Sequence, residues 1–319
     1  MLAMNPKPNE TNLVRELQSI SGLRVKVSEP LARYTSMKVG GPADYFVEVE
    51  SELALAQLLC LLSLRGMPFR LLGNGSNVLI SDLGIEGVLI HLIGAFKNAE
   101  WHEQANESWV DAGAGQAVTQ LVRQAARRGY GGLEFAEGIP GSVGGALVMN
   151  AGAYGSEFEK VVVAVYGMTR QGTPIQLNRE EMRFTYRDSH LPAGIVVTRI
   201  RLSLHRQESS RVSIKVRELV IKRKSSQPSG YPNSGSMFRN PPDDYAGRLV
   251  EAAGLKGKQI GGAQISPKHG NFIVNLGGAS AEDVRRLMEL ARAEVQAKFG
   301  VVLIPEVKLI GRWPSLRVE

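Results

Sequence analysis

A dense cluster of glycines between residues 138 and 155 is the feature that most limits what this chain can fold into. The segment reads GIPGSVGG from Gly138 to Gly145 and NAGAYG from Asn150 to Gly155. Glycine is used where the backbone turns into the left-handed region or approaches another group without a Cβ in between. So little side-chain bulk predicts a backbone that closely approaches a flat or phosphorylated ligand. A group of unusual turns without a ligand is the alternative.

A second glycine-containing loop, GNGSN from Gly73 to Asn77, directly follows an apolar, strand-like stretch at 69–72. Successive backbone N–H groups of such a loop can converge on phosphate oxygens, and Ser and Asn add neutral donors. The loop has neither the lysine of the Walker motif nor the G-x-G-x-x-G spacing of dinucleotide-binding folds. An ordinary Gly/Asn turn is therefore the alternative.

Three further motifs carry side chains suited to chemistry: YRDS at 186–189, SGSMFRNP at 234–241 and PEV at 305–307. Arg187 can clamp a carboxylate or a phosphate, or can form a surface salt bridge. Ser236 can be a nucleophile, a capping residue or a proton donor, but it lacks the G-x-S-x-G elbow of hydrolases. Glu306 stands in an apolar strand, which predicts a raised pKa and a possible acid, unless it faces outward at an edge.

Composition limits the class of protein. With 319 residues, 43% hydrophobic and 22% charged, the chain can bury a core in two or three structural units. Its net charge of +7 suits nucleic acid, small polyanions such as nucleotides and sugar diphosphates, or simply a basic surface. The basic residues are dispersed and no nucleic-acid-binding signature accompanies them, so we expect no nucleic acid partner.

Cysteine and histidine usage points to a reducing compartment and away from metal. Cys60 is the only cysteine, so no intramolecular disulfide can form, and its Leu-rich surroundings predict a buried core thiol. The five histidines show no metal-ligand spacing, so we expect no metal site. Residues 1–12 lack an apolar signal-peptide core, and the apolar stretch at 53–64 is too short to span a bilayer. We expect a cytoplasmic protein without a membrane partner.

Strand-like and helix-like segments alternate, which indicates an α/β or α+β protein. The predicted strands are 43–49, 69–72, 78–81, 88–92, 161–168, 195–204, 271–276 and 301–310, the last broken by Pro305. The predicted helices are 53–65 capped by Ser51, 119–128 closed by Gly129, 212–224, one capped by Asp243 or Asp244 that ends near Gly254, and one from Ser280, with Asp283 at its third position, to Gly300. The Ser/Pro/Gly-rich stretch at 225–236 is the best candidate for a domain boundary.

In this order, the motifs resemble those of the UDP-N-acetylenolpyruvoylglucosamine reductase family: G-x-G-S-N, G-I-P-G-x-V-G-G with N-x-G-A-Y-G, Y-R-x-S, G-S-x-F-[KR]-N-P and P-E-V. Each motif alone is weak, but the ordered set, spread from Gly73 to Glu306, is specific. The resemblance implies an α+β fold: an FAD-binding domain of the vanillyl-alcohol-oxidase (PCMH) type in two α/β subdomains, plus a smaller C-terminal α+β substrate-binding domain. The implied ranges are 22–91 and 92–224 for the subdomains and 225–300 for the substrate domain, with the C-terminal strand 301–312 returning to the first subdomain.

The resemblance also implies an activity: NADPH-dependent reduction of UDP-N-acetylglucosamine enolpyruvate to UDP-N-acetylmuramate through FAD, in peptidoglycan precursor synthesis. Arg187 and Glu306 would stabilise the negative charge that develops on the enolpyruvyl carboxylate, and Ser236 would donate the proton. The implied FAD-binding residues are Gly73, Asn74, Gly75, Ser76, Asn77, Gly138, Ile139, Pro140, Gly141, Ser142, Gly144, Gly145, Asn150 and Gly152. The implied substrate-binding residues are Tyr154, Gln227, Arg239 and Asn240.

Details of the match refine this expectation. The first loop contains no histidine, so we expect noncovalent FAD. Arg239 replaces the lysine that is common in the family motif, and Leu191 stands where an aromatic residue is usual. The short interval from Arg187 to Ser236 resembles the shorter family class, which lacks an inserted loop with a substrate-covering tyrosine. We expect a monomer. The alternatives are a sugar or lactone oxidase with the same flavin domain and a basic nucleic-acid-binding protein without a cofactor.

Overall fold

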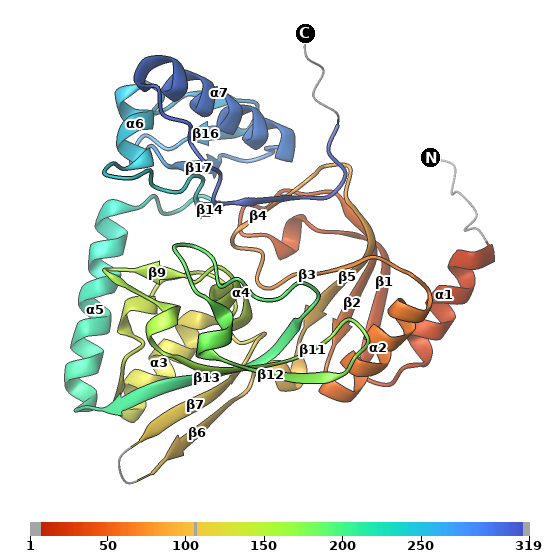
Figure 1. The fold of residues 1–319 in the computed structure, drawn as a ribbon. Helices are drawn as coiled ribbons and strands as arrows, with labels where there is room; N and C mark the ends of the chain where they lie inside the picture. The colour runs from red at the N-terminus through yellow and green to blue at the C-terminus, as the bar shows by residue number, and fades with distance from the viewer. Residues whose placement is uncertain (1–7, 105–106, 315–319) are drawn as a thin grey trace.

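The computed structural model describes residues 8–104 and 107–314, which form three sheet-based parts joined by helices (Figure 1). The helices are α1 (Pro8–Ser19), α2 (Glu52–Leu64), α3 (Val118–Arg128), α4 (Val143–Val148), α5 (Ser209–Ser226), α6 (Ala246–Ala252) and α7 (Ala281–Phe299). The strands are β1 (Leu23–Pro30), β2 (Pro42–Val49), β3 (Phe69–Leu71), β4 (Val78–Ile80), β5 (Ile85–Leu92), β6 (Ala99–Glu103), β7 (Ser108–Gly113), β8 (Tyr130–Gly131), β9 (Gly152–Ala153), β10 (Ser156–Glu157), β11 (Val162–Met168), β12 (Pro174–Asn178), β13 (Val196–Arg206), β14 (Asn233–Ser236), β15 (Gln259–Ile260), β16 (Ala263–Ile265), β17 (Phe272–Asn275) and β18 (Lys308–Ile310).

The first sheet has the strand order β1-β2-β5-β3, with β5 parallel to both β2 and β3. Helix α2 begins as predicted, because the Ser51 side chain accepts a hydrogen bond from the amide of Ala54. Its buried positions recur every three or four residues and therefore share one face: Ala54, Leu55, Leu58, Leu59 and Leu62.

The prediction that the Cys60 thiol is buried in the core is wrong. Cys60 is exposed, although leucines flank it on both sides. Each residue of an α-helix is rotated by roughly 100° from the one before it, so a neighbour of buried Leu59 is turned away from the core. Apolar residues lie all around α2, but only one face of the helix packs against the core.

The second sheet is antiparallel, with the strand order β12-β11-β13-β7-β6, and β8 extends β13. Helix α3 packs on it with Val118, Leu121, Val122, Ala125 and Ala126 buried. The helix ends at Gly129, whose φ of 73° is the left-handed conformation that glycine adopts most readily. The strand and helix predictions for this region are confirmed.

The third part has the strand order β14-β17-β16-β15 and carries α6 and α7. The predicted start of α7 is confirmed: Ser280 and Asp283 form a reciprocal capping box, and Gly300 ends the helix with φ 69°. The predicted cap of α6 is wrong. Asp244 pairs with Arg248 and with the amide of Tyr245, while Oδ1 of Asn240 accepts from the amide of Ala246.

The C-terminal segment returns to the first part of the chain. Strand β18 pairs in parallel with β4, and Asp82 beside β4 accepts from the first two amides of α7. The predicted strand over 301–310 is wrong for residues 301–307. Pro305 has no N–H to donate, so these residues make only an isolated bridge to Phe238 and scattered hydrogen bonds.

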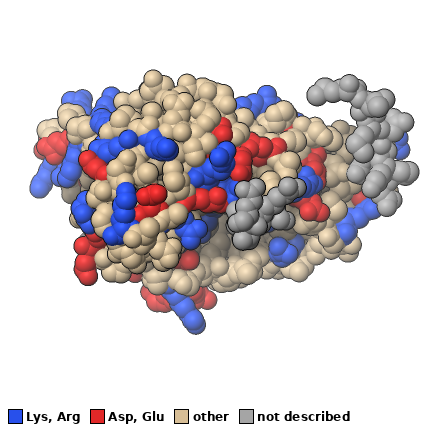
Figure 2. Space-filling model, turned by 90° about the horizontal axis from the view of Figure 1, so that it is seen from above, with Lys and Arg blue, Asp and Glu red and all other residues tan. Residues whose placement is uncertain are grey.

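The predicted α+β class is confirmed by three larger sheets, which are mixed or antiparallel, together with the helices that pack on them. The stretch expected at a domain boundary, 225–236, contains the end of α5 and the start of β14, which belongs to the third sheet. Among the described residues, no helix is both long and apolar enough to cross a membrane. Figure 2 shows acidic and basic side chains intermixed on the upper face of the molecule.

Candidate functional site

An arginine and a glutamate that lie far apart in sequence form the centre of the candidate site. Nε of Arg187 donates to Oε1 of Glu306 at 3.0 Å, across a separation of 119 residues. Both side chains are largely withdrawn from solvent, with 20% and 18% of their surface exposed. A second nitrogen of the guanidinium donates to the carbonyl of Gly152 at 3.3 Å. The pair is therefore held in place but remains accessible to a ligand.

Ser236 is brought to this pair through the backbone. The segment 304–307 runs beside 237–239: the amide of Glu306 donates to the carbonyl of Met237 at 2.8 Å, and the amide of Arg239 donates to that of Ile304 at 2.9 Å. Ser236 ends β14 directly before Met237 and is partly exposed. Its hydroxyl makes no hydrogen bond within the part of the chain that the structure describes. It is therefore free to donate to a ligand.

Arg187 is presented by a strained turn. Its φ of 61° lies in the left-handed region, which is sparsely populated by residues that carry a Cβ. Two backbone hydrogen bonds between Thr185 and Asp188 close the turn, and the buried Ser189 anchors it to the carbonyl of Val148 at the end of α4. Strain of this kind persists only where surrounding contacts enforce it, and it is concentrated at functional sites.

The GNGSN loop lies next to Glu306. Nδ2 of Asn77 donates to the carbonyl of Glu306 at 3.2 Å, and the amide of Lys308 donates to the carbonyl of Asn77 at 3.0 Å. None of the five backbone N–H groups from Gly73 to Asn77 donates to an acceptor within residues 8–104 and 107–314. Of these five residues only Gly75 is buried, and such a run of unpaired amides is suited to bind phosphate oxygens.

The second glycine-rich loop packs directly on the first. Oγ of Ser76 donates to the carbonyl of Pro140 at 3.0 Å. Gly141 has φ 126°, a conformation that strongly favours glycine, and a Cβ there would lie 2.8 Å from Oγ of Ser76. Ser142 caps α4, and the amides of Gly144 and Gly145 are already engaged inside the protein. The end of this loop is therefore occupied by structural hydrogen bonds.

A segment that the sequence analysis did not single out supports the first loop from below. The amide of Ser36 donates to the carbonyl of Gly75 at 3.0 Å, and a Cβ on Gly75 would lie 2.1 Å from the carbonyl oxygen of Tyr34. The Tyr34 ring packs on Phe46 with centroids 4.3 Å apart. No local motif marks these residues, because their role arises from a contact between distant segments.

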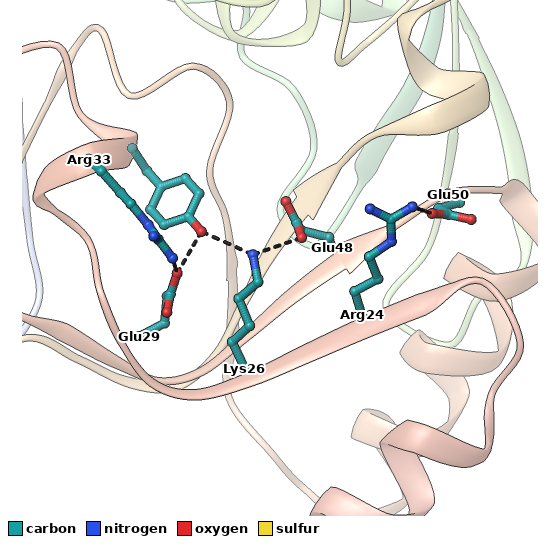
Figure 3. Close-up of polar contacts among 7 residues, drawn as sticks. Arg24, Lys26, Glu29, Arg33, Glu48 and Glu50 are labelled. Carbon is teal, nitrogen blue, oxygen red and sulfur yellow. Dashed lines mark hydrogen bonds and ion pairs between the residues drawn. The ribbon is translucent and has the colours of Figure 1, made fainter.

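A row of polar contacts along β1 and β2 fixes Tyr34 in place. Its hydroxyl donates to Glu29 at 2.6 Å and accepts from Lys26 at 3.2 Å. Figure 3 shows the charged side chains of this region, which come from the two strands and the residues that directly follow them: Arg24, Lys26, Glu29, Arg33, Glu48 and Glu50. The charged row therefore serves to position the support beneath the GNGSN loop.

The other predicted site residues are divided between the site and the scaffold. Asn150 is fully buried and bonds the carbonyl of Thr185 and the amide of Glu159, which is a structural role for its side chain. Tyr154 is exposed beside α5 and donates to the carbonyl of Leu219 at 3.1 Å. Gln227 follows the end of α5, and Asn240 holds the start of α6.

The surroundings of the Arg187–Glu306 pair shift the pKa of the Glu306 carboxyl. Burial raises the pKa of Glu306, and the nearby charges of Arg187 and then Arg239 oppose this shift without cancelling it. Nε of Arg239 is buried and lacks a partner among the described residues, while its NH2 donates to the carbonyl of Arg187. The arrangement can hold an anion between two guanidinium groups, beside an acid with a raised pKa and a free hydroxyl.

Comparison with known proteins gives two family matches that together cover most of the chain. Residues 227–310 match the family described as UDP-N-acetylenolpyruvoylglucosamine reductase, C-terminal domain, and residues 43–178 match the family described as FAD binding domain. The first contains Ser236 and Glu306, and the second contains both glycine-rich loops.

Similar proteins extend over nearly the whole chain. UDP-N-acetylenolpyruvoylglucosamine reductase 2 of Symbiobacterium thermophilum is 44% identical over 91% of this chain and 94% of its own length. Reductase 1 of Bacillus cereus is 43% identical over 94% of this chain and 99% of its own length. The crystal structure of UDP-N-acetylenolpyruvylglucosamine reductase from Thermus caldophilus has a TM-score of 0.76 and 38% identity, and covers 92% of this chain and 99% of that protein.

Proposed function

The chain belongs to the UDP-N-acetylenolpyruvoylglucosamine reductase family, and from this premise we propose that it reduces UDP-N-acetylglucosamine enolpyruvate to UDP-N-acetylmuramate with NADPH. It is an FAD-binding oxidoreductase whose FAD-binding domain has the vanillyl-alcohol-oxidase type of fold. The observation that carries the proposal is the Arg187–Glu306 pair, held beside Ser236 and against the GNGSN loop. The product is a precursor of peptidoglycan.

The residues present fit FAD. The unpaired amides of 73–77 suit the pyrophosphate, and the close approach of Gly141 to Ser76 joins this nest to the second loop. Bound FAD would supply the redox chemistry, taking a hydride from NADPH and delivering it to the enolpyruvyl methylene carbon. The protein orients the substrate, excludes water, stabilises the developing negative charge and supplies the proton.

Each residue of the candidate site has a proposed role. Arg187 counters the negative charge that develops on the enolpyruvyl carboxylate, and the strained turn preorganises its guanidinium. Glu306 sets the orientation of Arg187 by accepting a hydrogen bond from its Nε, and burial raises the pKa of this carboxyl. Ser236 donates a proton to the carbon beside the carboxylate. A serine is a weak acid, so it can do this only for a strongly basic, enolate-like carbon.

The direct test is an absorbance spectrum of the purified protein before and after NADPH. We expect a flavin spectrum that bleaches on addition of NADPH and returns on addition of the enolpyruvyl substrate under anaerobic conditions. A colourless protein that binds DNA with a steep salt dependence would contradict the proposal. Reoxidation by oxygen and simple sugars, with no response to the enolpyruvyl substrate, would instead indicate an oxidase.

We expect the FAD to be noncovalent. The Gly73–Asn77 loop contains no side chain that forms flavin bonds, and the ring of His91 lies behind it, stacked near Phe46 with Nδ1 2.8 Å from the carbonyl oxygen of Leu72. Flavin should therefore stay with the protein through dialysis and appear in the supernatant after acid precipitation. Flavin that remains on the precipitated chain would contradict this, and peptide mapping would show whether His91 is the attachment site.

Replacing Gly141 by valine should strongly reduce the flavin content. The new Cβ would lie 2.8 Å from Oγ of Ser76 and would disturb the hydrogen bond of that hydroxyl to the carbonyl of Pro140, at a backbone φ of 126° that disfavours side chains. The matched control is Gly257→Val, because Gly257 also has positive φ but nothing within 4 Å of an added Cβ. Both variants carry backbone strain of about 1–3 kcal/mol. Only Gly141→Val should lose flavin. Flavin content is measured as flavin absorbance relative to protein, after circular dichroism has confirmed that each variant is folded. A normal flavin content in Gly141→Val would refute the role of the loop in flavin binding.

A further inference from the structure

A polar groove lies outside the site described above, between one face of α3 and the segment 97–101. Its volume is about 640 Å³, within the range of small-molecule sites. Gln120 and Gln124 line it from the face of α3 that is opposite to the buried apolar face, and the buried Gln116 lines it just before the helix begins. We name it the α3 groove and define it by these residues together with Asn98, Lys97, Trp101, Arg127 and Arg128.

The charge lining the α3 groove is all of one sign. Lys97, Arg127 and Arg128 line it, and no carboxylate from the described part of the chain does. None of the three cations forms an ion pair with any residue in 8–104 or 107–314; Glu103, two residues beyond Trp101, is paired with Arg206 instead. Arg128 is held over the Trp101 ring, with the guanidinium carbon 5.2 Å from the ring centroid. Three uncompensated cations around one hollow favour an anion, and guanidinium groups match phosphate geometry.

A buried amide of the groove lacks a partner. Gln116 is only 1% exposed, and its Nε2 donates to Oε1 of Gln124 at 3.2 Å, but its own Oε1 has no hydrogen bond within the described chain. Its backbone is fixed, because the carbonyl accepts from the amide of Val143 at 2.8 Å. A buried acceptor without a donor costs about 1–3 kcal/mol. A ligand with an N–H or O–H group in the groove would satisfy it.

From these two observations we infer that the α3 groove binds an organic phosphate, a phosphate group on a polar body such as a nucleoside or a sugar. The phosphate pairs with Arg127, Arg128 and Lys97. The amides of Asn98, Gln116, Gln120 and Gln124 bond the donors and acceptors of the organic part. The groove shares no lining residue with the Arg187–Glu306 site, so this binding does not depend on the proposed function.

The test is calorimetric titration of the full chain, as purified, with AMP, glucose 1-phosphate and inorganic phosphate. We expect one site, tighter binding of at least one ester than of phosphate, and quenching of Trp101 fluorescence that is absent in Trp101→Phe. The variant Arg127→Ala/Arg128→Ala should weaken the ester about tenfold or more, since both charge-assisted contacts are lost. Both arginines are exposed, so this variant should fold.

The matched control is Arg286→Ala, which removes an exposed cation of α7 and should bind the ester as wild type does. Three results would overturn the inference. One is that neither ester binds. Another is that the double variant binds the ester as tightly as wild type, which would place the ester elsewhere. The third is that phosphate binds as tightly as both esters, which would leave an adventitious ion only.

Discussion

Replacing Ser236 by alanine is expected to leave reduction of bound FAD by NADPH near the wild-type rate and to slow reoxidation by the enolpyruvyl substrate about 10²–10⁴-fold. The two half-reactions differ in their need for a proton. Hydride transfer from NADPH involves no proton to the sugar substrate, whereas reduction of the enolpyruvyl group is completed by protonation of the carbon beside the carboxylate. The hydroxyl of Ser236 makes no hydrogen bond inside the described chain, so its removal leaves no protein group unpaired.

Stopped-flow absorbance at the flavin band follows each half-reaction separately. The matched control is Ser225→Ala, since that exposed hydroxyl bonds only the carbonyl of Lys222 in its own helix. It should leave both rates unchanged. If Ser236→Ala reoxidised at the wild-type rate, or lost the NADPH half-reaction instead, the proton-donor assignment would be wrong.

Replacing Arg187 by alanine is expected to slow the same reoxidation step roughly 10²–10³-fold. This corresponds to a rise of about 2.7–4 kcal/mol in the activation free energy, because the charge stabilisation by the guanidinium is lost. The variant should also change the pH profile. Burial raises the pKa of Glu306 and the charge of Arg187 lowers it, so removal of Arg187 should raise that pKa further. Any limb of the pH profile that reflects titration of Glu306 should therefore move to higher pH. Ser236→Ala leaves the Arg187–Glu306 pair intact and should not move it.

Three companion variants separate charge from geometry. Arg187→Lys keeps the charge but loses the fork that reaches both Glu306 and the carbonyl of Gly152, so its rate should lie between those of wild type and Arg187→Ala. Glu306→Gln should abolish the pH-dependent limb altogether. Arg183→Ala is the control, because Arg183 is exposed and also has positive φ. A pH profile unchanged in Arg187→Ala would argue against electrostatic coupling of the pair.

Local sequence was sufficient wherever a structure depends on neighbours along the chain. The capping box at Ser280, the cap at Ser51 and the glycine end of α3 were all predicted, since each involves residues within one or two helical turns. The α+β class was predictable for the same reason, from the alternation of periodic segments.

Predictions failed where several partners compete for one group or where packing between segments decides the outcome. Asp244 does not cap α6, because Arg248 takes its carboxylate and Asn240 supplies the hydrogen bond to Ala246. Residues 301–307 do not extend β18, because their neighbours are 237–239, where Pro305 interrupts the pairing. The exposure of Cys60 depends on which face of α2 meets the sheet, and a nearly all-apolar sequence does not specify that face.

For the candidate site, the sequence by itself determined which residue types are available: two glycine-rich loops, one arginine, one serine and one glutamate in a specific order. The tertiary structure alone decided their contacts, since Asn77 reaches Glu306 across 229 residues and Arg187 reaches it across 119. It also placed Tyr34 and Ser36 beneath the first loop and left the amides of 73–77 unpaired. The sequence predicted the raised pKa of Glu306 from its apolar neighbours, but the burial that causes this shift and the partners that oppose it arise only when distant segments pack together.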